Sequence, residues 1–384
     1  MSGSAWVVVV VAPVVFGCAQ PLVEDSFTPA QWDTLRASFT VPPYDVCQGV
    51  AEPRCTQLAE LGRDLFSDNA LSSDGGQVPE GAHHAVSCAD CHDAGAYYVD
   101  IASTPTTSVS TGALKATAHN ALPLVNLAIK DTVAGARPAY GWTGLASTAD
   151  VLLKLALPKA MASNAGTVRE ALRNKHWTAY VALFGDRTLV RNIPADAEQD
   201  AALLANLADV FDKYERRLVA VSSRFDQFIG GTESALTTEE RHGFQLFATT
   251  ALCIECHDGP LLTDLEFHVT GVRSEHPDHG RTSLTGDPAD EGAFLTPSLR
   301  NVGATGPYMH AGQLELVGDV VDFYRRGGDE DGFLGTRDPR IEPIEMTDDD
   351  AHDLALFLGT LTGDEPDCRW AASGSGSGSG SACP

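Results

Sequence analysis

Two short stretches of the chain contain two cysteines three positions apart, with a histidine directly after the second cysteine. They read SCADCH at 87–92 and LCIECH at 252–257. In such a unit both thiols lie on one side of a helical turn, where they can form thioether bonds to the vinyl groups of a haem while the histidine binds the iron. The sequence therefore predicts two covalently bound c-type haems. Their attachment residues are Cys88, Cys91 and His92 for the first haem, and Cys253, Cys256 and His257 for the second.

Two other kinds of site use closely spaced cysteines. A zinc site needs two such pairs to converge on one ion, and its ligands rarely include a histidine next to each pair. A thioredoxin-like redox pair needs an alternation of strands and helices that the sequence does not show. Haem attachment explains both units better than either alternative. A protein with two haems is an electron carrier or an enzyme, and an enzyme needs one iron with an open coordination position.

The composition is that of a folded globular protein with an acidic surface. The chain has 384 residues, of which 43% are hydrophobic and 20% charged, and its formal net charge is −26. This length is sufficient for two domains, each with its own core. The negative charge argues against nucleic acid and against an anionic membrane surface as partners. It favours a basic protein partner, unless the acidic surface serves solubility alone.

The N-terminus is typical of an exported protein. Residues 1–18 contain an apolar run that ends in Gly17 and Cys18, which matches a signal peptide cleaved before a lipid-modified cysteine. No lysine or arginine precedes the run, so a plain signal peptide or a misassigned start is the alternative. We therefore expect a periplasmic protein, with an outer-membrane lipid anchor through Cys18 as the finer expectation.

The remaining sequence has the pattern of a mainly α protein. Apolar periodicity and capping signals predict helices from Leu58 onward and at 167–185, 195–220, 237–248, 314–326 and 347–359. The stretches 21–55 and 258–312 look irregular, and 373–381 alternate Ser and Gly. The predicted organisation is a signal peptide at 1–18, a tether at 19–55, two CxxCH-centred units at 56–230 and 231–368, and a Gly/Ser-rich tail at 369–384.

Four cysteines lie outside the haem units and the signal, namely Cys47, Cys55, Cys368 and Cys383. An even number of such cysteines in an exported protein predicts disulfides. The short separations suggest Cys47–Cys55 and Cys368–Cys383, but the sequence leaves the pairing open.

Several longer motifs resemble the bacterial dihaem cytochrome c peroxidase and MauG-type family. They are GRDLFSDNALSSDGG before the first CxxCH, RRLVAVSSRFDQFIGG, LCIECHDGPLLTD and GAFLTPSLRNVGATGPYMHAG. The resemblance covers about residues 58 to 360. It implies that both units are cytochrome c-like domains, that the first haem reacts with peroxide, that the second haem relays electrons, and that calcium lies between them.

The resemblance also implies roles for residues between the two units. Trp142, in YGWTG, matches the tryptophan that relays electrons between the haems, although the same ring could be a core aromatic. Asn120, Thr305 and Pro307 match calcium ligands of the family. Oxygen donors of this kind suit a hard cation, whereas outside this family such residues would be ordinary loop positions.

The sixth ligand of the second haem differs from the peroxidase pattern. Peroxidases of the family have a methionine 14 residues after the histidine of PYxH, and here that position is Tyr324. A phenolate favours ferric iron and lowers the reduction potential, whereas a thioether does the opposite. MauG-type members carry a tyrosine at this place. The alternative is that Tyr324 only packs on a helix and that the iron uses Met309 or no sixth ligand.

The first haem pocket also departs from the family. The stretch LPKAMASNAGTVR at 157–169 has no acidic residue where family peroxidases have a glutamate that moves the proton of peroxide. General acid–base help of this kind contributes about 10²–10⁴-fold. His119 is the nearest substitute in the sequence, although a lone histidine is more often structural. Ala113 stands near the place of a distal histidine found in some members, which predicts an open first iron at rest.

Three functions follow from these features. The first is a dihaem peroxidase that reduces hydrogen peroxide with electrons from a small cytochrome c or a cupredoxin, with His92 and Trp142 in the reaction path. The second is a MauG-type oxidase that uses peroxide to modify side chains of a partner protein, which Tyr324 favours. The third is a non-enzymatic electron carrier or sensor, which the missing glutamate would permit.

Overall fold

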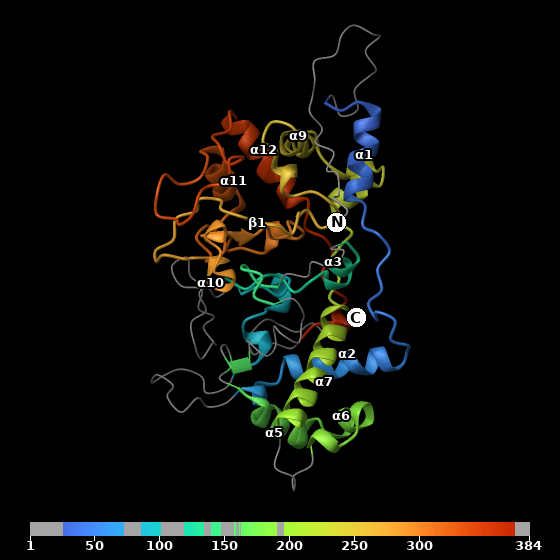
Figure 1. Cartoon of the computed structure of the whole chain (residues 1–384). Helices are drawn as coiled ribbons and strands as arrows, with labels where there is room; N and C mark the ends of the chain where they lie inside the picture. Colours follow the sequence, from blue (N-terminus) through green and yellow to red (C-terminus); the bar gives the residue numbers. More distant parts are fainter. Residues whose placement is uncertain are drawn as a thin grey trace, which may run out of the picture.

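The computed structural model describes residues 26–72, 86–100, 119–133, 140–146, 157–158, 161, 163–189 and 196–372. Helices dominate these residues, which confirms the mainly α prediction (Figure 1). The helices of the first half are α1 (Pro29–Phe39), α2 (Arg54–Phe66), α3 (Leu127–Val133), α5 (Ala165–Lys175), α6 (Trp177–Phe184) and α7 (Ala197–Glu215). Those of the second half are α8 (Arg224–Ile229), α9 (Thr238–Ala248), α10 (Thr282–Thr285), α11 (Val317–Arg325) and α12 (Asp348–Gly359).

The only sheet among the described residues consists of two short antiparallel strands, β1 (Phe267–His268) and β2 (Phe294–Leu295). Phe267 pairs with Leu295, so the sheet closes the long loop between the second CxxCH and α11. This loop was expected to be irregular, and apart from the two strands, α10 and short 3-10 turns it is. Its shape comes from turns and side-chain contacts.

The first core forms where α2 crosses α7. The two helices approach so closely that a Cβ at Gly62 would lie 2.5 Å from the carbonyl oxygen of Val210, so this position requires glycine. Leu58, Leu65 and Tyr214 are fully buried at the crossing. The apolar faces predicted around 58–65 and 203–218 therefore meet each other in this first cluster.

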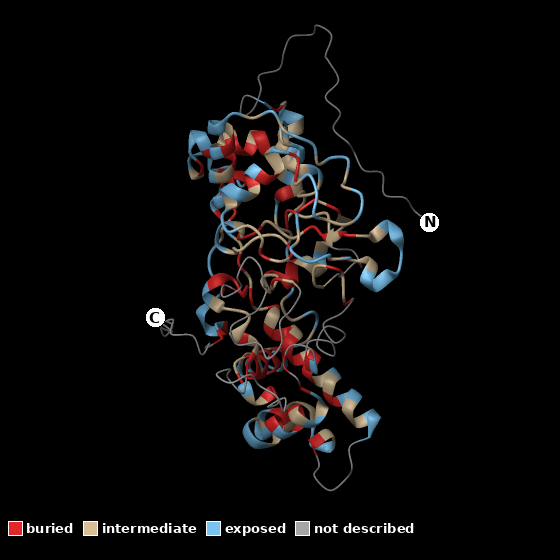
Figure 2. Cartoon of the chain, turned by 90° about the vertical axis from the view of Figure 1, so that its left-hand side faces the viewer, coloured by how far each residue is buried: buried red, intermediate tan, exposed pale blue. Residues whose placement is uncertain are grey.

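The second core is aromatic and lies where α9 packs on α12. Phe244 sits at its centre, with its ring 5.3 Å from Phe225 and 5.4 Å from Phe357. α9 starts at the capping box predicted from the sequence, Thr237 with Glu240, and α12 starts at a second box, Thr347 with Asp350. Figure 2 shows the buried residues gathered into two masses along the molecule, one for each cluster.

The two ends of the described chain cross over between these clusters. Residues 19–55 were predicted to be an irregular tether, but α1 forms within them, and Phe27 and Phe39 pack into the second cluster. Figure 1 shows α1 beside α9. Conversely Trp370 and Ala372, predicted to belong to the tail, are buried in the first cluster. The prediction failed at both ends because each segment finds its apolar partners in the distant half of the chain.

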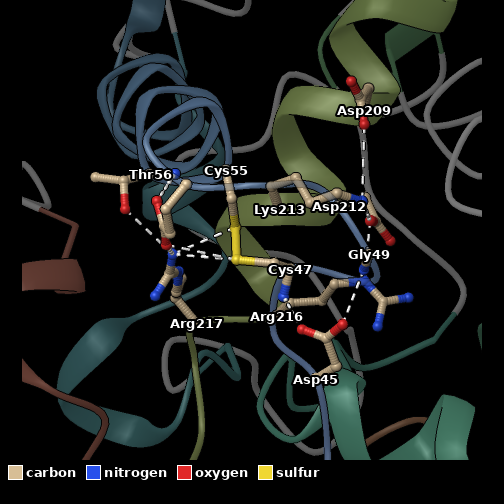
Figure 3. The surroundings of a disulfide bond; sticks show 11 residues. Asp45, Cys47, Gly49, Cys55, Thr56, Asp209, Asp212, Lys213, Arg216 and Arg217 are labelled. Atoms are coloured by element: carbon tan, nitrogen blue, oxygen red, sulfur yellow. Dashed lines mark hydrogen bonds and ion pairs between the residues drawn. A yellow bond between two sulfur atoms is a disulfide. The ribbon is translucent and has the colours of Figure 1, made fainter.

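A disulfide between Cys47 and Cys55 holds the chain where it passes from α1 to α2. This confirms the local pairing suggested by the sequence. Figure 3 shows the Arg217 guanidinium beside this bond, where its Nη2 lies 3.3 Å from Cys55 Sγ and 2.7 Å from Glu52 Oε1. Cys368 is also disulfide-bonded, and its expected partner Cys383 lies outside the described residues.

The expected signal peptide at 1–18, including Cys18, lies outside the described residues as well. Within the described ranges, no helix combines the length and the apolar character that crossing a bilayer would require.

Candidate functional site

The second CxxCH unit forms a 3-10 turn, Cys253–Glu255, directly after α9. His257 follows, and its Nδ1 lies 2.9 Å from the carbonyl oxygen of Leu262. Burial lowers the pKa of His257, so the neutral imidazole is favoured. With Nδ1–H donated to a carbonyl, Nε2 is the nitrogen that can bind a metal.

An apolar slot opens beside this turn. It is lined by Cys253, His257, Tyr324 and Met346, together with the aliphatic side chains of Leu299, Val302, Val317, Val320, Val321, Ile344, Leu354 and Leu358. Burial in the slot raises the pKa of the Cys253 thiol to about 12, and the cysteines of the two CxxCH motifs form no disulfide. A flat apolar cofactor attached through thiols fits this lining, since the slot presents thiol, imidazole and hydrocarbon.

Two side chains in the slot could complete the coordination of an iron bound by His257. Tyr324 lies there from α11, and Met346 lies there just before the N-cap of α12. Burial, with a contribution from the Cys253 and Cys256 thiols, raises the pKa of Tyr324 well above its usual range. A neutral thioether carries no such cost. The sequence pointed to Tyr324 or Met309 as the sixth ligand and not to Met346. A methionine just before a helix start has no sequence signal that marks it as an iron ligand.

The first CxxCH unit has the same local design. Cys88–Asp90 forms a 3-10 turn, and His92 Nδ1 lies 2.7 Å from the carbonyl oxygen of Tyr98. Burial lowers the pKa of His92, which again favours the neutral imidazole with Nε2 available to a metal. Phe66 packs 6.2 Å from the His92 ring. The first unit therefore also fits a haem, because it offers two thiols and an imidazole whose ring is held with Nε2 available.

Trp142 is fixed between the two halves of the molecule. Its indole N–H donates to the carbonyl oxygen of Asn120 at 2.9 Å, and its own carbonyl accepts from the backbone N–H of Leu295 in β2 at 2.7 Å. Its ring lies 6.5 Å from that of His310. Trp142 belongs to the first unit of the chain, and these contacts hold it against residues of the second unit.

Asn120 also contacts the loop that carries the other expected calcium ligands. Its backbone N–H donates to the carbonyl of His310 at 2.7 Å, and its side-chain amide contacts the Pro307 carbonyl oxygen at 2.8 Å. The structure thus brings Asn120 and Pro307 together, with Thr305 two residues away in the same loop. Whether this cluster binds calcium stays a prediction.

His119 lies against residues of the second half rather than in the stretch that lacks the glutamate. Its Nε2 is 2.9 Å from Asp278 Oδ2, and its ring meets Phe294 and His310 edge-on. His310 stacks on Phe294 at 3.8 Å, and burial lowers its pKa to about 4. The role of His119 in proton transfer stays a prediction.

Glu215 is an acidic residue near the first unit that the sequence reasoning missed. It ends α7, and desolvation raises its pKa to about 8, with Asp212 adding to the shift and Arg216 opposing it. Desolvation is the main cause of the raised pKa of Cys88 and of Tyr140, and Glu215 makes a smaller contribution to both shifts. A carboxyl group with a raised pKa therefore lies near the first haem-attachment residues. Ala113 and part of the 157–169 stretch lie outside the described residues.

Comparison with known proteins agrees with this site. A family model described as di-haem cytochrome c peroxidase matches residues 56–234. The methylamine utilization protein MauG of Methylorubrum extorquens is 30% identical over 335 residues, covering 85% of this chain and 84% of that protein. The chain belongs to the dihaem cytochrome c peroxidase and MauG family.

Further relatives of this family cover a similar share of the chain. The cytochrome-c peroxidase IdrP1 of Denitromonas iodatirespirans is 28% identical over 349 residues, 82% of this chain and 84% of that one. The crystal structure of a MauG-like protein associated with microbial copper homeostasis superposes with a TM-score of 0.65 at 26% identity, covering 84% of this chain and 94% of that chain.

Membership in the dihaem peroxidase and MauG family makes the protein an oxidoreductase that acts on peroxide and carries two c-type haems. The two units described above are the places where the chain offers thiols and a neutral imidazole in the required order. The cytochrome c-like character predicted for them agrees with the fold of the superposed structure.

Proposed function

We propose that the protein reduces hydrogen peroxide at the haem attached to Cys88 and Cys91, with electrons that enter through the haem attached to Cys253 and Cys256. The donor is a small periplasmic cytochrome c or a cupredoxin, and the acidic surface suits a basic donor. The observation that carries this proposal is Trp142, whose indole N–H donates to a carbonyl of the first unit and whose backbone carbonyl accepts from the second unit. Such a fixed aromatic ring is what a relay between two separated redox centres requires.

Individual side chains have separate roles in iron binding and proton donation. When bound, the haems supply the electron transfers that reduce peroxide to water. His92 and His257 would hold the irons through Nε2, because each donates Nδ1–H to a backbone carbonyl. Reduction of one peroxide to two waters consumes two electrons and two protons, so a proton donor near the first unit is needed. Desolvation raises the pKa of Glu215 to about 8, and this carboxyl group is our candidate, in competition with His119.

The test of this function is turnover of the holoprotein with peroxide and a reduced cytochrome c. We expect two donor molecules to be oxidised per peroxide. Trp142→Phe should slow this turnover several-fold while leaving the reaction of peroxide with the first haem intact. Trp177→Phe is the matched control, since Trp177 is 42% exposed in α6 and should leave turnover unchanged. Peroxide consumption that does not need the second haem would contradict the proposal.

The proton-donor role is tested by Glu215→Gln, with Glu198→Gln, an exposed residue of the same helix, as the control. A lost general acid reduces the peroxide reaction by about 10²–10⁴-fold. His119→Gln should then have little effect. The reverse pattern would transfer the role to His119.

A second candidate function is the MauG-type oxidation of side chains on a partner protein. Tyr324 favours it, because a phenolate ligand would lower the potential of the second haem and hinder its reduction by a donor. In that case peroxide should be consumed slowly with cytochrome c, and the partner protein should be oxidised instead. The sixth ligand therefore separates the two functions.

We further propose a calcium ion held by Asn120, Thr305 and Pro307. The side-chain amide of Asn120 already faces the Pro307 carbonyl, and turning that amide over would place two oxygens toward one cation. One calcium per chain is expected by metal analysis, with loss in Asn120→Ala. Retention of calcium in that variant would rule out the assignment. A periplasmic location and a lipid anchor through Cys18 complete the proposal, and mass spectrometry of the exported protein would detect the anchor.

A further inference from the structure

Three consecutive carbonyls follow the second haem-binding histidine, and each accepts a hydrogen bond from the segment 298–300. Arg300 Nε donates to the Pro260 carbonyl at 2.6 Å, and Ser298 Oγ donates to the Leu261 carbonyl at 2.6 Å. The backbone N–H of Leu299 donates to the Leu262 carbonyl at 3.4 Å. The Leu262 carbonyl is also the acceptor for His257 Nδ1–H.

The rest of the Arg300 side chain is fixed by a partly buried carboxylate. Its Nη1 and Nη2 donate to the two oxygens of Asp226 at 2.7 and 2.9 Å. Arg300 is 2% exposed. Asp226 in turn accepts from the N–H and the hydroxyl of Ser223, at the start of α8. Arg300 lowers the pKa of Asp226, against the effect of burial, so the pair is charged.

A buried charged pair is costly unless its hydrogen-bonding capacity is used. Here the guanidinium uses Nε for the Pro260 carbonyl and both Nη atoms for Asp226. Leu262 has a positive φ of 52°, a conformation that leucine rarely adopts without support. The segment therefore holds the loop in a shape that it would not take by itself, with the Leu262 carbonyl aimed at His257.

We propose that Arg300, braced by Asp226 and assisted by Ser298, is a positioning residue that sets the reduction potential of the second haem. A firm hydrogen bond from Nδ1–H to a fixed carbonyl makes the imidazole a stronger donor and favours ferric iron. Loosening the loop weakens this bond and raises the potential. The inference rests on the proposed role of His257 as iron ligand, and it adds the element that tunes that ligand.

Arg300→Lys tests the proposal, because lysine keeps the charge for Asp226 but has one nitrogen and cannot also hold the Pro260 carbonyl. In the two-haem protein we expect the ratio of reduced to oxidised second haem, at a fixed ambient potential, to rise roughly tenfold, the lower end of outer-shell effects on metal sites. The first haem should not change. Ser298→Ala should shift the ratio in the same direction, and Ser298→Thr, which keeps the hydroxyl, should restore it.

Arg224→Lys is the matched control. Arg224 pairs with both oxygens of Glu240 and donates Nε to the Ala235 carbonyl at 3.0 Å, but that carbonyl lies outside the histidine loop. This variant should lose stability only, so its ratio of reduced to oxidised second haem should stay at the wild-type value. An unchanged ratio in both Arg300→Lys and Ser298→Ala, with two haems bound, would overturn the positioning role. Fewer than two haems in the wild-type protein would instead contradict the proposed function.

Discussion

The two CxxCH units share a local design and differ in what holds it in place. In each unit the histidine of the motif donates Nδ1–H to a carbonyl five or six residues later. In the second unit this carbonyl is held by the segment 298–300, 36 to 38 positions further along the chain. In the first unit the carbonyl belongs to Tyr98, whose ring hydroxyl donates to the Trp370 carbonyl at 3.2 Å, across 272 positions.

At the carbonyl that accepts from the histidine, the second unit therefore has its support nearby, whereas the first unit depends on the C-terminal end of the described chain. Tyr214 of α7 donates to the same Trp370 carbonyl at 3.0 Å, and Arg217 lies over the Trp370 ring at 5.1 Å while touching the disulfide. The first unit is thus closed by the C-terminal segment and the Cys47–Cys55 region together. The unit proposed to meet peroxide is the one that long-range contacts support.

The largest expected effect separates the haems themselves. Replacing Cys88 and Cys91 with alanine should halve the haem bound per chain and abolish the peroxide reaction. Replacing Cys253 and Cys256 should also halve the haem, but it should leave the first haem able to react with peroxide while donor-supported turnover is lost. Haem staining after denaturation and turnover on the same samples measure both. Two haems remaining in either double variant would contradict the attachment assignment.

The next effect distinguishes the sixth ligand of the second unit. Removing the side chain that binds the iron should convert this haem from a low-spin to a high-spin spectrum and let it bind cyanide. We compare Tyr324→Phe with Met346→Leu, since both side chains line the slot and each substitution keeps the volume nearly constant. If Tyr324 is the ligand, Tyr324→Met should also raise the potential. An unchanged spectrum in both variants would exclude both residues.

A smaller effect concerns the contact between the units, where His310 is buried. The pKa of His310 is lowered to about 4, with burial as the main cause and Asp278 opposing it. Between pH 6.5 and 4 the unfolded chain binds a proton at this histidine that the folded protein does not, so stability falls as the pH decreases through this window. His310 contributes up to about 3 kcal/mol to this loss.

Urea unfolding at pH 7 and pH 4.5 measures the loss, and His310→Gln removes this titration. The variant should therefore show a smaller decrease in unfolding free energy between the two pH values than the wild type. Asp278 and His119 face His310 from neighbouring segments, so the comparison is made between proteins at each pH. An identical decrease in both proteins would show that folding does not lower the pKa of His310.

The sequence predicted the parts of the site that are written in local patterns. The two CxxCH motifs, the capping box at Thr237 and the apolar stripe of α7 all depend on residues within a few positions of each other. The predicted helix at 167–185 is two helices, α5 and α6, because the first ends at His176, whose ring is bound to Asp68. That partner lies 108 positions away and leaves no local signal.

The features that could not be predicted from the sequence depend on contacts between distant parts of the chain. Burial of Trp370 and Phe39 in the opposite halves of the molecule depends on the crossing of the chain ends. The raised pKa of Glu215 depends on how α7 ends among Asp212, Arg216 and the first haem-attachment residues. Met346 is a candidate ligand because the folded chain places it in the same slot as Tyr324. Each of these features arises from tertiary packing, which periodicity and motif spacing do not contain.

The smallest expected effect tests whether the first unit alone depends on the disulfide. Cys47 and Cys55 are eight positions apart, and closing a loop of this length stabilises a protein by about 2.5 kcal/mol in the chain-entropy model. The double variant Cys47→Ser, Cys55→Ser should lose this amount in chemical unfolding followed at the first haem. The potential of the second haem should not change, because its loop is held by residues 298–300.

Cys368→Ser serves as the comparison, because it removes the disulfide of Cys368, which lies beside Trp370 rather than beside α2. If the first unit is closed from both sides, each variant should destabilise the first haem region, and their combination should cost more than either alone. The comparison would be reversed by a disulfide variant that changes the potential of the second haem but leaves the stability of the first haem region unchanged. The two units would then exchange roles, with long-range contacts supporting the electron-entry haem instead of the haem that meets peroxide.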